Sequence, residues 1–419
     1  MDRTLYPGSV WGQIDIPASK SQTIHALLIA LFARGRSTIT NPLFCTDTQA
    51  CLDFCEKIGA HISYADDRLI VDSSRLEPRD GLEIDCRNSG TTLYFATALA
   101  CTLGVDIRFT GDESLQHRPV RALLNSLNEL GANVDAEAEN APYNVCGPLL
   151  GGHTSIRCMT GQFLNALLLA SPLARQDVVI DVHLLKEKTA VRTTEIWLEK
   201  QDIEFMRGRD MTHYTIRGNQ FYKPLEADIN GDFSLAAFFF CAAAITGSTI
   251  SVTHLDAKSS QADKAILDIL SNMGCSVRSE GHTVTLTGPS RLKATDIDLG
   301  GTPDLIPALA VTACFASGPV RLLNVSHNIV KGSKERSSTI AQNINELGGR
   351  AQVLEDSLVI YPISSFNGCS KVKSFGDPRI AMAMAVASLK CEKSLTIEDS
   401  ECVEMTFPSF FEKFTGILT

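Results

Sequence analysis

Six stretches of the chain are apolar on nearly every helical face, and each follows a short cluster of small or polar residues. The stretches cover residues 25–35, 93–104, 163–174, 235–247, 306–318 and 380–390. The clusters before them lie near residues 20, 89, 160, 231, 303 and 377, which makes a repeat of about 70 residues. Because a helix without a polar face must be enclosed by the rest of the protein, we predict six interior helices.

A second series of helices has the same spacing. Residues 52–62, 123–134, 196–205, 266–277 and 340–351 carry apolar side chains at roughly i, i+3, i+4 and i+7, which is typical of amphipathic helices, and 407–418 begins a sixth copy. In four copies the pattern ends at a glycine suited to a left-handed cap: Gly59, Gly131, Gly274 and Gly348. An alternating strand precedes each of these helices, and two short strands follow, for example at 282–288 and 356–362.

One repeat is therefore a buried helix, a strand, an amphipathic helix and paired strands, which predicts an α/β (α+β) fold. The amphipathic helices and the sheets should cover the interior helices. A chain of 419 residues is too long for one ordinary domain, so we predict two lobes of three repeats each. We place one lobe at 18–229 and the other at 1–17 plus 230–419, with the N-terminal strand at 12–17 joining the later half.

Composition and charge exclude several classes of protein. Hydrophobic residues at 44% and charged residues at 21% are ordinary for a globular chain. With 38 Lys and Arg against 48 Asp and Glu, the net charge of −10 argues against nucleic acid or an anionic membrane as a partner. Thirteen cysteines never form a CxxC pair, so we expect reduced core cysteines and no metal site. No secretion signal or membrane span is evident, and we expect a cytoplasmic monomer.

An anion site can still exist locally, at the starts of the interior helices. A helix N-terminus carries free N–H groups and a partial positive charge, so a cation placed there calls for an anion, either bound or structural. Lys20, Arg336 and Arg379 occupy such positions. Asp304 and Asp377 also lie at helix starts, where carboxylates are as often ordinary caps as functional groups.

Several of these clusters match known motifs. They are PASKS at 17–21, NSGTT at 88–92, HRP at 117–119, GQFL at 161–164, GDFSLAAFF at 231–239, PD at 303–304, DPR at 377–379 and CVEMTFP at 402–408. In this order and spacing the chain resembles the enolpyruvyl transferase family and, within it, the EPSP synthases. The resemblance implies two lobes, each of three βαβαββ units, with an active-site cleft between them.

The resemblance also implies a reaction and the residues that perform it. The enolpyruvyl group of phosphoenolpyruvate would pass to the 5-hydroxyl of shikimate 3-phosphate with release of phosphate, a step toward chorismate and the aromatic amino acids, without metal or cofactor. By position, Lys20, Gly90, Arg118, Gln162, Arg336 and Arg379 match the phosphoenolpyruvate side. The acceptor side matches Ser21, His25, Thr91, Thr160, Gln162, Asp304 and Asn328. Lys20 and Asp304 would be catalytic, Asp304 as the base for the hydroxyl.

Departures from the family pattern fall mainly on the acceptor side. His25 and Tyr94 replace arginines, Thr160-Gly161 replace a serine pair, Glu187 and Ala190 replace a serine and a tyrosine, Gly332 and Ser333 replace a lysine and a glutamate, and Met405 replaces a lysine. Three readings stay open. The phosphate pocket is rebuilt from Lys186, Lys188 and Arg192; or the acceptor is a different hydroxyl compound; or the chain binds without turnover. Whether Glu335 substitutes for the missing acid is also open.

Overall fold

The chain forms two compact units, each with its own hydrophobic core. The computed structural model describes residues 1–135, 137–185, 188–325, 336–368 and 371–419. Unit 1 consists of Met1–Pro17 and Asn230–Thr419, and unit 2 consists of Ala18–Ile229. The buried apolar side chains of each unit form a continuous cluster.

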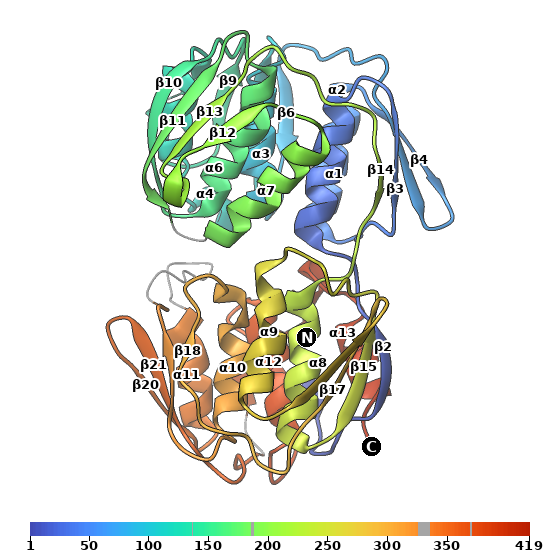
Figure 1. Ribbon diagram of the computed structural model, residues 1–419, viewed down its shortest axis with the longest axis vertical. Helices are drawn as coiled ribbons and strands as arrows, with labels where there is room; N and C mark the ends of the chain where they lie inside the picture. The colour runs from blue at the N-terminus through green and yellow to red at the C-terminus, as the bar shows by residue number, and fades with distance from the viewer. Residues whose placement is uncertain (136, 186–187, 326–335, 369–370) are drawn as a thin grey trace. The chain divides into compact units, whose positions relative to one another are not determined.

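Three helices fill the interior of each unit, as the apolar stretches predict (Figure 1). In unit 2 they are α1 (Lys20–Phe32), α3 (Gly90–Ala100) and α6 (Gly161–Ala170). In unit 1 they are α8 (Phe233–Thr246), α10 (Ile306–Ala313) and α12 (Pro378–Ser388). Every residue of α8 except Thr246 is buried. Because side chains on all faces of these helices are removed from water, the interior helices account for much of the burial that stabilises each unit.

The amphipathic helices are also present. They are α2 (Thr46–Ile58), α5 (Arg121–Glu129), α7 (Lys188–Lys200), α9 (Ala265–Asn272), α11 (Arg336–Glu346) and α13 (Phe410–Gly416), with a short α4 (Glu113–Gln116) between α3 and α5. The four predicted glycine ends are confirmed, because Gly59, Gly131, Gly274 and Gly348 all have positive φ. A residue with a Cβ atom is strained in that conformation, so glycine ends these helices at low cost.

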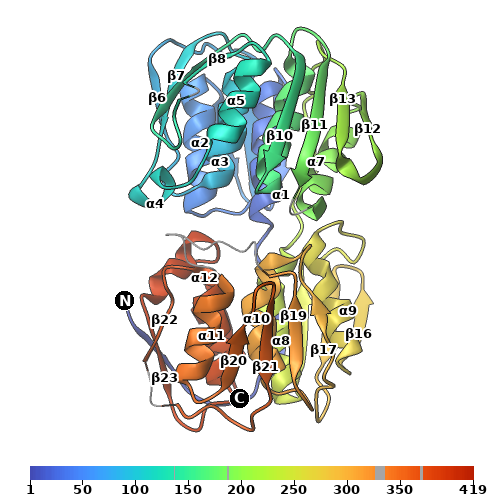
Figure 2. The ribbon, with the colours of Figure 1, turned by 90° about the vertical axis from the view of Figure 1, so that its left-hand side faces the viewer.

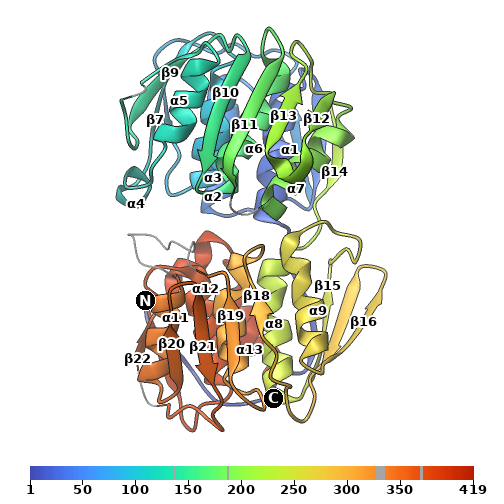
Figure 3. The same cartoon turned by 60° about the vertical axis from the view of Figure 1, so that its left-hand side comes forward.

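Each unit is covered by three sheets, which Figures 2 and 3 show outside the helices. In unit 2 the strand orders are β14-β3-β5-β4, β6-β7-β9-β8 and β10-β11-β13-β12. Their bounds are β3 (Arg36–Thr40), β4 (His61–Ala65), β5 (Arg68–Asp72), β6 (Leu82–Asp85), β7 (Asp106–Thr110), β8 (Asn133–Val134), β9 (Tyr143–Cys146), β10 (Gly152–Cys158), β11 (Val178–Leu185), β12 (Phe205–Arg207), β13 (His213–Ile216) and β14 (Glu226–Asp228).

The sheets of unit 1 have the orders β16-β17-β15-β2, β18-β19-β21-β20 and β1-β23-β22. Their strands are β1 (Arg3–Leu5), β2 (Gly12–Asp15), β15 (Thr249–Thr253), β16 (Ser276–Glu280), β17 (Thr283–Thr287), β18 (Ile297–Asp298), β19 (Val320–Leu323), β20 (Arg350–Val353), β21 (Ser357–Tyr361), β22 (Lys371–Lys373) and β23 (Leu395–Glu398). In all six sheets, one parallel pair adjoins antiparallel strands. This common pattern is the structural form of the sequence repeat.

Two edge strands pair with strands that are far from them in the sequence. β2 precedes α1 in the chain but pairs in parallel with β15 of unit 1. β14 precedes α8 but pairs in parallel with β3 of unit 2. Both strands lie directly before a point where the chain passes from one unit to the other. The first repeat is therefore completed by β14, from the end of unit 2, and the fourth repeat by β2, from the beginning of unit 1.

Two further features of the described residues are the burial of the cysteines and the length of the helices. Twelve cysteines are free thiols, and all of them except Cys146 are buried, as expected for core residues. Burial raises the pKa of the Cys86 thiol. Among the described residues no group of His, Cys, Asp or Glu is arranged to hold a metal ion. No helix in the described part of the chain has the length and apolar character needed to cross a membrane.

Candidate active site

Lys20 is the first residue of α1, and the anion that its position calls for is a protein carboxylate. Its Nζ lies 2.6 Å from Oδ2 of Asp47, which belongs to the first turn of α2. Both side chains are largely buried, with 24% and 12% of their surface exposed. The Asp47 carbonyl also accepts a hydrogen bond from the Thr92 hydroxyl at 3.2 Å. Asp47 therefore connects the heads of α1, α2 and α3. The sequence analysis missed it, although an acidic residue in the first turn of the next helix was a usable signal.

Gly90 and Arg118 lie together at the head of α3, as their shared predicted ligand requires. The guanidinium of Arg118 donates through Nη2 to Oδ1 of Asn88 at 3.3 Å. A Cβ atom added at Gly90 would lie 2.6 Å from Nη1 of Arg118. Only glycine leaves room for the guanidinium in this place. The hydroxyl of Ser89 caps the helix by accepting from Thr92 N at 3.2 Å.

The head of α6 adjoins the same group of helix starts. Thr160 is its N-cap residue and accepts a hydrogen bond from Gln162 N at 3.3 Å. Tyr94 of α3 packs edge-on against Phe163 of α6, with ring centroids 5.0 Å apart. Within unit 2, Asp47 therefore links the starts of α1 and α3, and α6 packs against α3 through Phe163. Ser21 is exposed, and Thr91, Thr160 and Gln162 are half-buried.

The structure gives His25 a different role from the predicted contact with an acceptor. Its side chain is completely buried, and both ring nitrogens are engaged, Nδ1 with the Ser21 carbonyl at 2.7 Å and Nε2 with the Thr194 hydroxyl at 2.8 Å. Burial lowers the pKa of His25 to about 4, although the bond to Ser21 acts in the opposite direction. The ring is therefore neutral near pH 7. It links α1 to α7 and has no free donor for a ligand.

Arg192, suggested for a rebuilt phosphate pocket, is paired with two glutamates, and its role in such a pocket stays a prediction. Its guanidinium pairs with Glu195 at 2.9 Å and with Glu199 at 2.7 Å. Glu195 is fully buried and also accepts from Arg207 and the Tyr214 hydroxyl. A buried carboxylate that lost a cationic partner would be strongly destabilising, so Arg192 serves the stability of α7. Lys188 is exposed at the first residue of α7, and Lys186 and Glu187 lie outside the described residues.

Unit 1 contains a compact network of two arginines and two aspartates. Arg336, the first residue of α11, contacts Asp304 through Nη1 at 2.8 Å and Asp377 through Nε at 2.9 Å. Arg379 contacts the other oxygen of Asp304 through Nη2 at 2.5 Å. Asp377 is the N-cap of α12 and accepts from Arg379 N at 2.8 Å. The network joins η4 (Pro303–Leu305), α11 and α12.

Burial and charge act in opposite directions within this network. Burial disfavours the charged form of Asp377, but the neighbouring guanidinium groups of Arg336 and Arg379 outweigh it and lower the pKa of the carboxyl. Burial likewise opposes the charge on Arg336, yet Asp377 and Asp304 raise its pKa. Asp304 is not a helix cap; its carboxylate holds two guanidinium groups and remains one-third exposed. Its predicted role as a base stays a prediction at this point.

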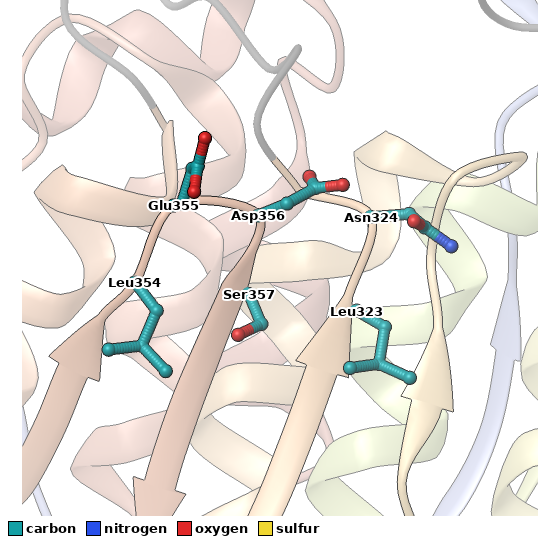
Figure 4. Close-up of a pocket in the computed structure, with 6 residues that line it drawn as sticks. All are labelled: Leu323, Asn324, Leu354, Glu355, Asp356 and Ser357. Atoms are coloured by element: carbon teal, nitrogen blue, oxygen red, sulfur yellow. The ribbon is translucent and has the colours of Figure 1, made fainter.

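The remaining predicted positions are not part of these contacts or lie outside the described residues. Asn328 and residues 332–335 are outside the described residues, so their predicted roles stay predictions. Met405 is partly buried and packs against the core of unit 1. Figure 4 shows a surface pocket lined by Leu323, Asn324 and residues 354–357, which contains no predicted site residue.

Comparison with known proteins identifies the family. Residues 6–414 match the family model of EPSP synthase (3-phosphoshikimate 1-carboxyvinyltransferase). The chain belongs to the EPSP synthase family. It is thus a member of a family of carboxyvinyltransferase enzymes, and the resemblance read from the sequence motifs is confirmed.

Relatives and solved structures agree with this EPSP synthase assignment. The protein named 3-phosphoshikimate 1-carboxyvinyltransferase from Acetivibrio thermocellus is 38% identical over 402 residues, 95% of this chain and 94% of its own. The protein of the same name from Methanocorpusculum labreanum is 36% identical over 404 residues, 95% of this chain and 94% of its own. A structure of EPSP synthase from Acinetobacter baumannii has a TM-score of 0.85 at 22% identity, covering 100% of this chain and 98% of that one. This structural likeness confirms the predicted fold class.

Proposed function

We propose that this EPSP synthase family member transfers the enolpyruvyl group of phosphoenolpyruvate to the 5-hydroxyl of shikimate 3-phosphate and releases phosphate. The observation that carries the proposal is the contact of Asp304 with both Arg336 and Arg379. It combines a base with two anion-binding groups of the kind that hold phosphate and carboxylate. Family membership supplies the reaction class.

The pairing of these groups suggests how substrate binding activates the base. In the free protein, the Asp304 carboxylate accepts two charged hydrogen bonds, which stabilise its ionised form. The phosphate and carboxylate of phosphoenolpyruvate would compete for the same guanidinium groups. When they take over these donors, the Asp304 carboxylate becomes a stronger base for the acceptor hydroxyl. The resulting alkoxide attacks C2 of phosphoenolpyruvate while C3 gains a proton, and the tetrahedral intermediate then expels phosphate.

Lys20 has a parallel role in unit 2. Its ammonium is held by Asp47, and the Arg118 guanidinium is held by Asn88 near Gly90. Both cations lie at helix heads, where N–H groups add to the attraction for anions. We propose that Lys20 and Arg118 bind a substrate anion, so that removal of either cation lowers turnover.

The test is phosphate release by the purified protein with phosphoenolpyruvate and shikimate 3-phosphate. Lys20→Met and Asp304→Ala should each lower kcat/KM by a factor on the order of 10³ or more, because each removes a charged group that contacts the reacting atoms. Lys57→Met, at the far end of α2, and Asp268→Ala, on the exposed face of α9, are matched controls that should retain activity. Full activity of Asp304→Ala would contradict the proposal.

A second candidate is transfer to a different hydroxyl acceptor. Two observations favour it. His25 is buried and neutral where the family pattern has an arginine, and Arg192, suggested for the rebuilt phosphate pocket, is paired with glutamates. Calorimetry separates the two candidates. Binding of phosphoenolpyruvate without any binding of shikimate 3-phosphate would favour the second.

A further inference from the structure

Asp263 is a buried carboxyl group in unit 1 to which the reaction above assigns no role. It lies in the short 3-10 helix η3 (Ala262–Lys264), directly before α9, and only 7% of its surface is exposed. The hydroxyl of Ser234, in the first turn of α8, donates a hydrogen bond to its Oδ2. Ser234 is itself 5% exposed, so the pair is shielded from water.

The surroundings of Asp263 are ordered by Gln261. The Gln261 amide oxygen accepts from Phe233 N at 2.9 Å, and its nitrogen donates to Oδ1 of Asp232 at 2.6 Å. Asp232 in turn caps α8 by accepting from Ser234 N at 2.8 Å. These bonds hold η3 against the head of α8, so Asp263 cannot turn to solvent without breaking them.

Acidic groups outnumber basic groups around this position. The charges that act on Asp263 are those of Asp304, Asp232 and Arg379. Arg336 and Asp377 complete the adjoining network. Lys264 directs its ammonium to the Ala257 carbonyl at 3.0 Å, and Asp268 of α9 is exposed. Among these groups, four carboxyls stand against two guanidinium groups. Burying an uncompensated carboxylate is costly, and the least costly relief is to keep one carboxyl protonated.

Asp263 is the carboxyl group best placed to keep that proton. Burial, followed by the negative charges of Asp304 and Asp232, raises the pKa of Asp263 to about 7, although the Ser234 hydrogen bond and Arg379 act in the opposite direction. Asp377, by contrast, is held ionised by the two arginines. The free protein therefore has Asp263 partly protonated near neutral pH.

We propose that Asp263 is a positioning residue that takes up a proton when phosphoenolpyruvate binds, and so keeps its own negative charge away from Arg379 and Asp304. The inference rests on the proposed function, because it needs an anion bound at Arg336 and Arg379. That anion adds negative charge near Asp263 and draws on the guanidinium groups that favour its ionised form. Both effects stabilise protonated Asp263. Substrate anion and proton consequently bind together, and Asp304 stays ionised beside the arginines.

Calorimetry of phosphoenolpyruvate binding at about pH 8, in buffers with different heats of ionisation, tests this coupling. Wild-type protein should take up a substantial fraction of one proton per ligand bound, and its affinity should fall by up to about tenfold per pH unit above pH 7. Asp263→Asn keeps the shape of the side chain but cannot ionise. It should therefore take up fewer protons per ligand, and its affinity for phosphoenolpyruvate should lack the part of the pH dependence that Asp263 causes. Subtracting the proton uptake of the variant from that of the wild type removes the contribution of the ligand's own phosphate.

Two further variants complete the experiment. Ser234→Ala removes a hydrogen bond that favours ionised Asp263, so proton uptake should extend to higher pH; this variant also serves if Asp263→Asn does not fold. Asp268→Asn, an exposed carboxyl on α9, should behave as wild type. Equal proton uptake by wild type and Asp263→Asn, or no shift with Ser234→Ala, would overturn the inference and leave the proposed function standing. Absence of phosphoenolpyruvate binding to the wild type would overturn both.

Discussion

Cations at helix starts in this protein are paired with carboxylates before any substrate arrives. Lys20 is held by Asp47, while Arg336 and Arg379 are held by Asp304. A charged side chain left unpaired in a partly buried place would be costly, so each pair keeps its cation in position and ready to exchange partners. The helix dipole predicts that an anion must be near these cations. It does not say which element supplies the anion; for Lys20 the signal was the acidic residue in the first turn of α2, which the prediction overlooked.

Gly90 allows function and stability to be separated. Gly90→Ala places a Cβ atom 2.6 Å from Nη1 of Arg118, so the guanidinium must move. Gly90 has no positive φ, and alanine favours helix, so the unfolding free energy should stay the same or rise by up to about 1 kcal/mol. The KM for phosphoenolpyruvate should rise at least severalfold. Steady-state kinetics and urea denaturation measure the two effects. Gly416→Ala, where the added atom meets open space, is the control; an unchanged KM in Gly90→Ala would contradict the assigned position of Arg118.

His25 should make the free energy of unfolding depend on pH. Its folded pKa of about 4 lies below the usual value of 6.5, so the unfolded chain binds the proton more strongly. The stability contributed by neutral His25 is thus present above about pH 6.5 and is lost as the pH falls toward 4. The loss should be on the order of 2 kcal/mol by pH 4.5. Denaturation of wild type and His25→Asn at several pH values measures the difference, and parallel pH profiles would contradict it.

At the scale of elements, hydrophobic periodicity predicts the helices because burial decides their faces. The six interior helices and the glycine ends at Gly59, Gly131, Gly274 and Gly348 follow from local pattern alone. The pairing of β14 with β3 cannot be predicted in this way, since it depends on which strands meet in space. His25 is a similar case, because its partner Thr194 lies 169 residues away in the sequence.

Gly59 tests the contribution of a helix end. It ends α2 with φ of 107°, and an added Cβ would lie 3.0 Å from the backbone nitrogen of Glu77. Gly59→Ala should lower the unfolding free energy by about 1–2 kcal/mol, because alanine is strained at this φ and the neighbouring atom belongs to the backbone. Urea denaturation measures the change. A loss no larger than that of Gly416→Ala would show that the left-handed cap contributes little.

At the scale of the whole molecule, the candidate residues are divided between the two units. Lys20, Gly90, Arg118 and Gln162 belong to unit 2, and Asp304, Arg336 and Arg379 belong to unit 1. Motif order along the chain was sufficient to identify the family and most of these positions. Periodicity alone gives the repeat but no chemistry, and the acceptor side is less readable because His25, Tyr94 and Met405 depart from the family pattern.

The proposed reaction forms a new C–O bond between phosphoenolpyruvate and shikimate 3-phosphate. Mass spectrometry of the reaction mixture, together with the amount of phosphate released, measures it directly. We expect one phosphate for each molecule of the enolpyruvyl ether of shikimate 3-phosphate, with neither product formed by Asp304→Ala. Phosphate release without that ether, or no consumption of shikimate 3-phosphate while the wild-type protein binds phosphoenolpyruvate, would contradict it.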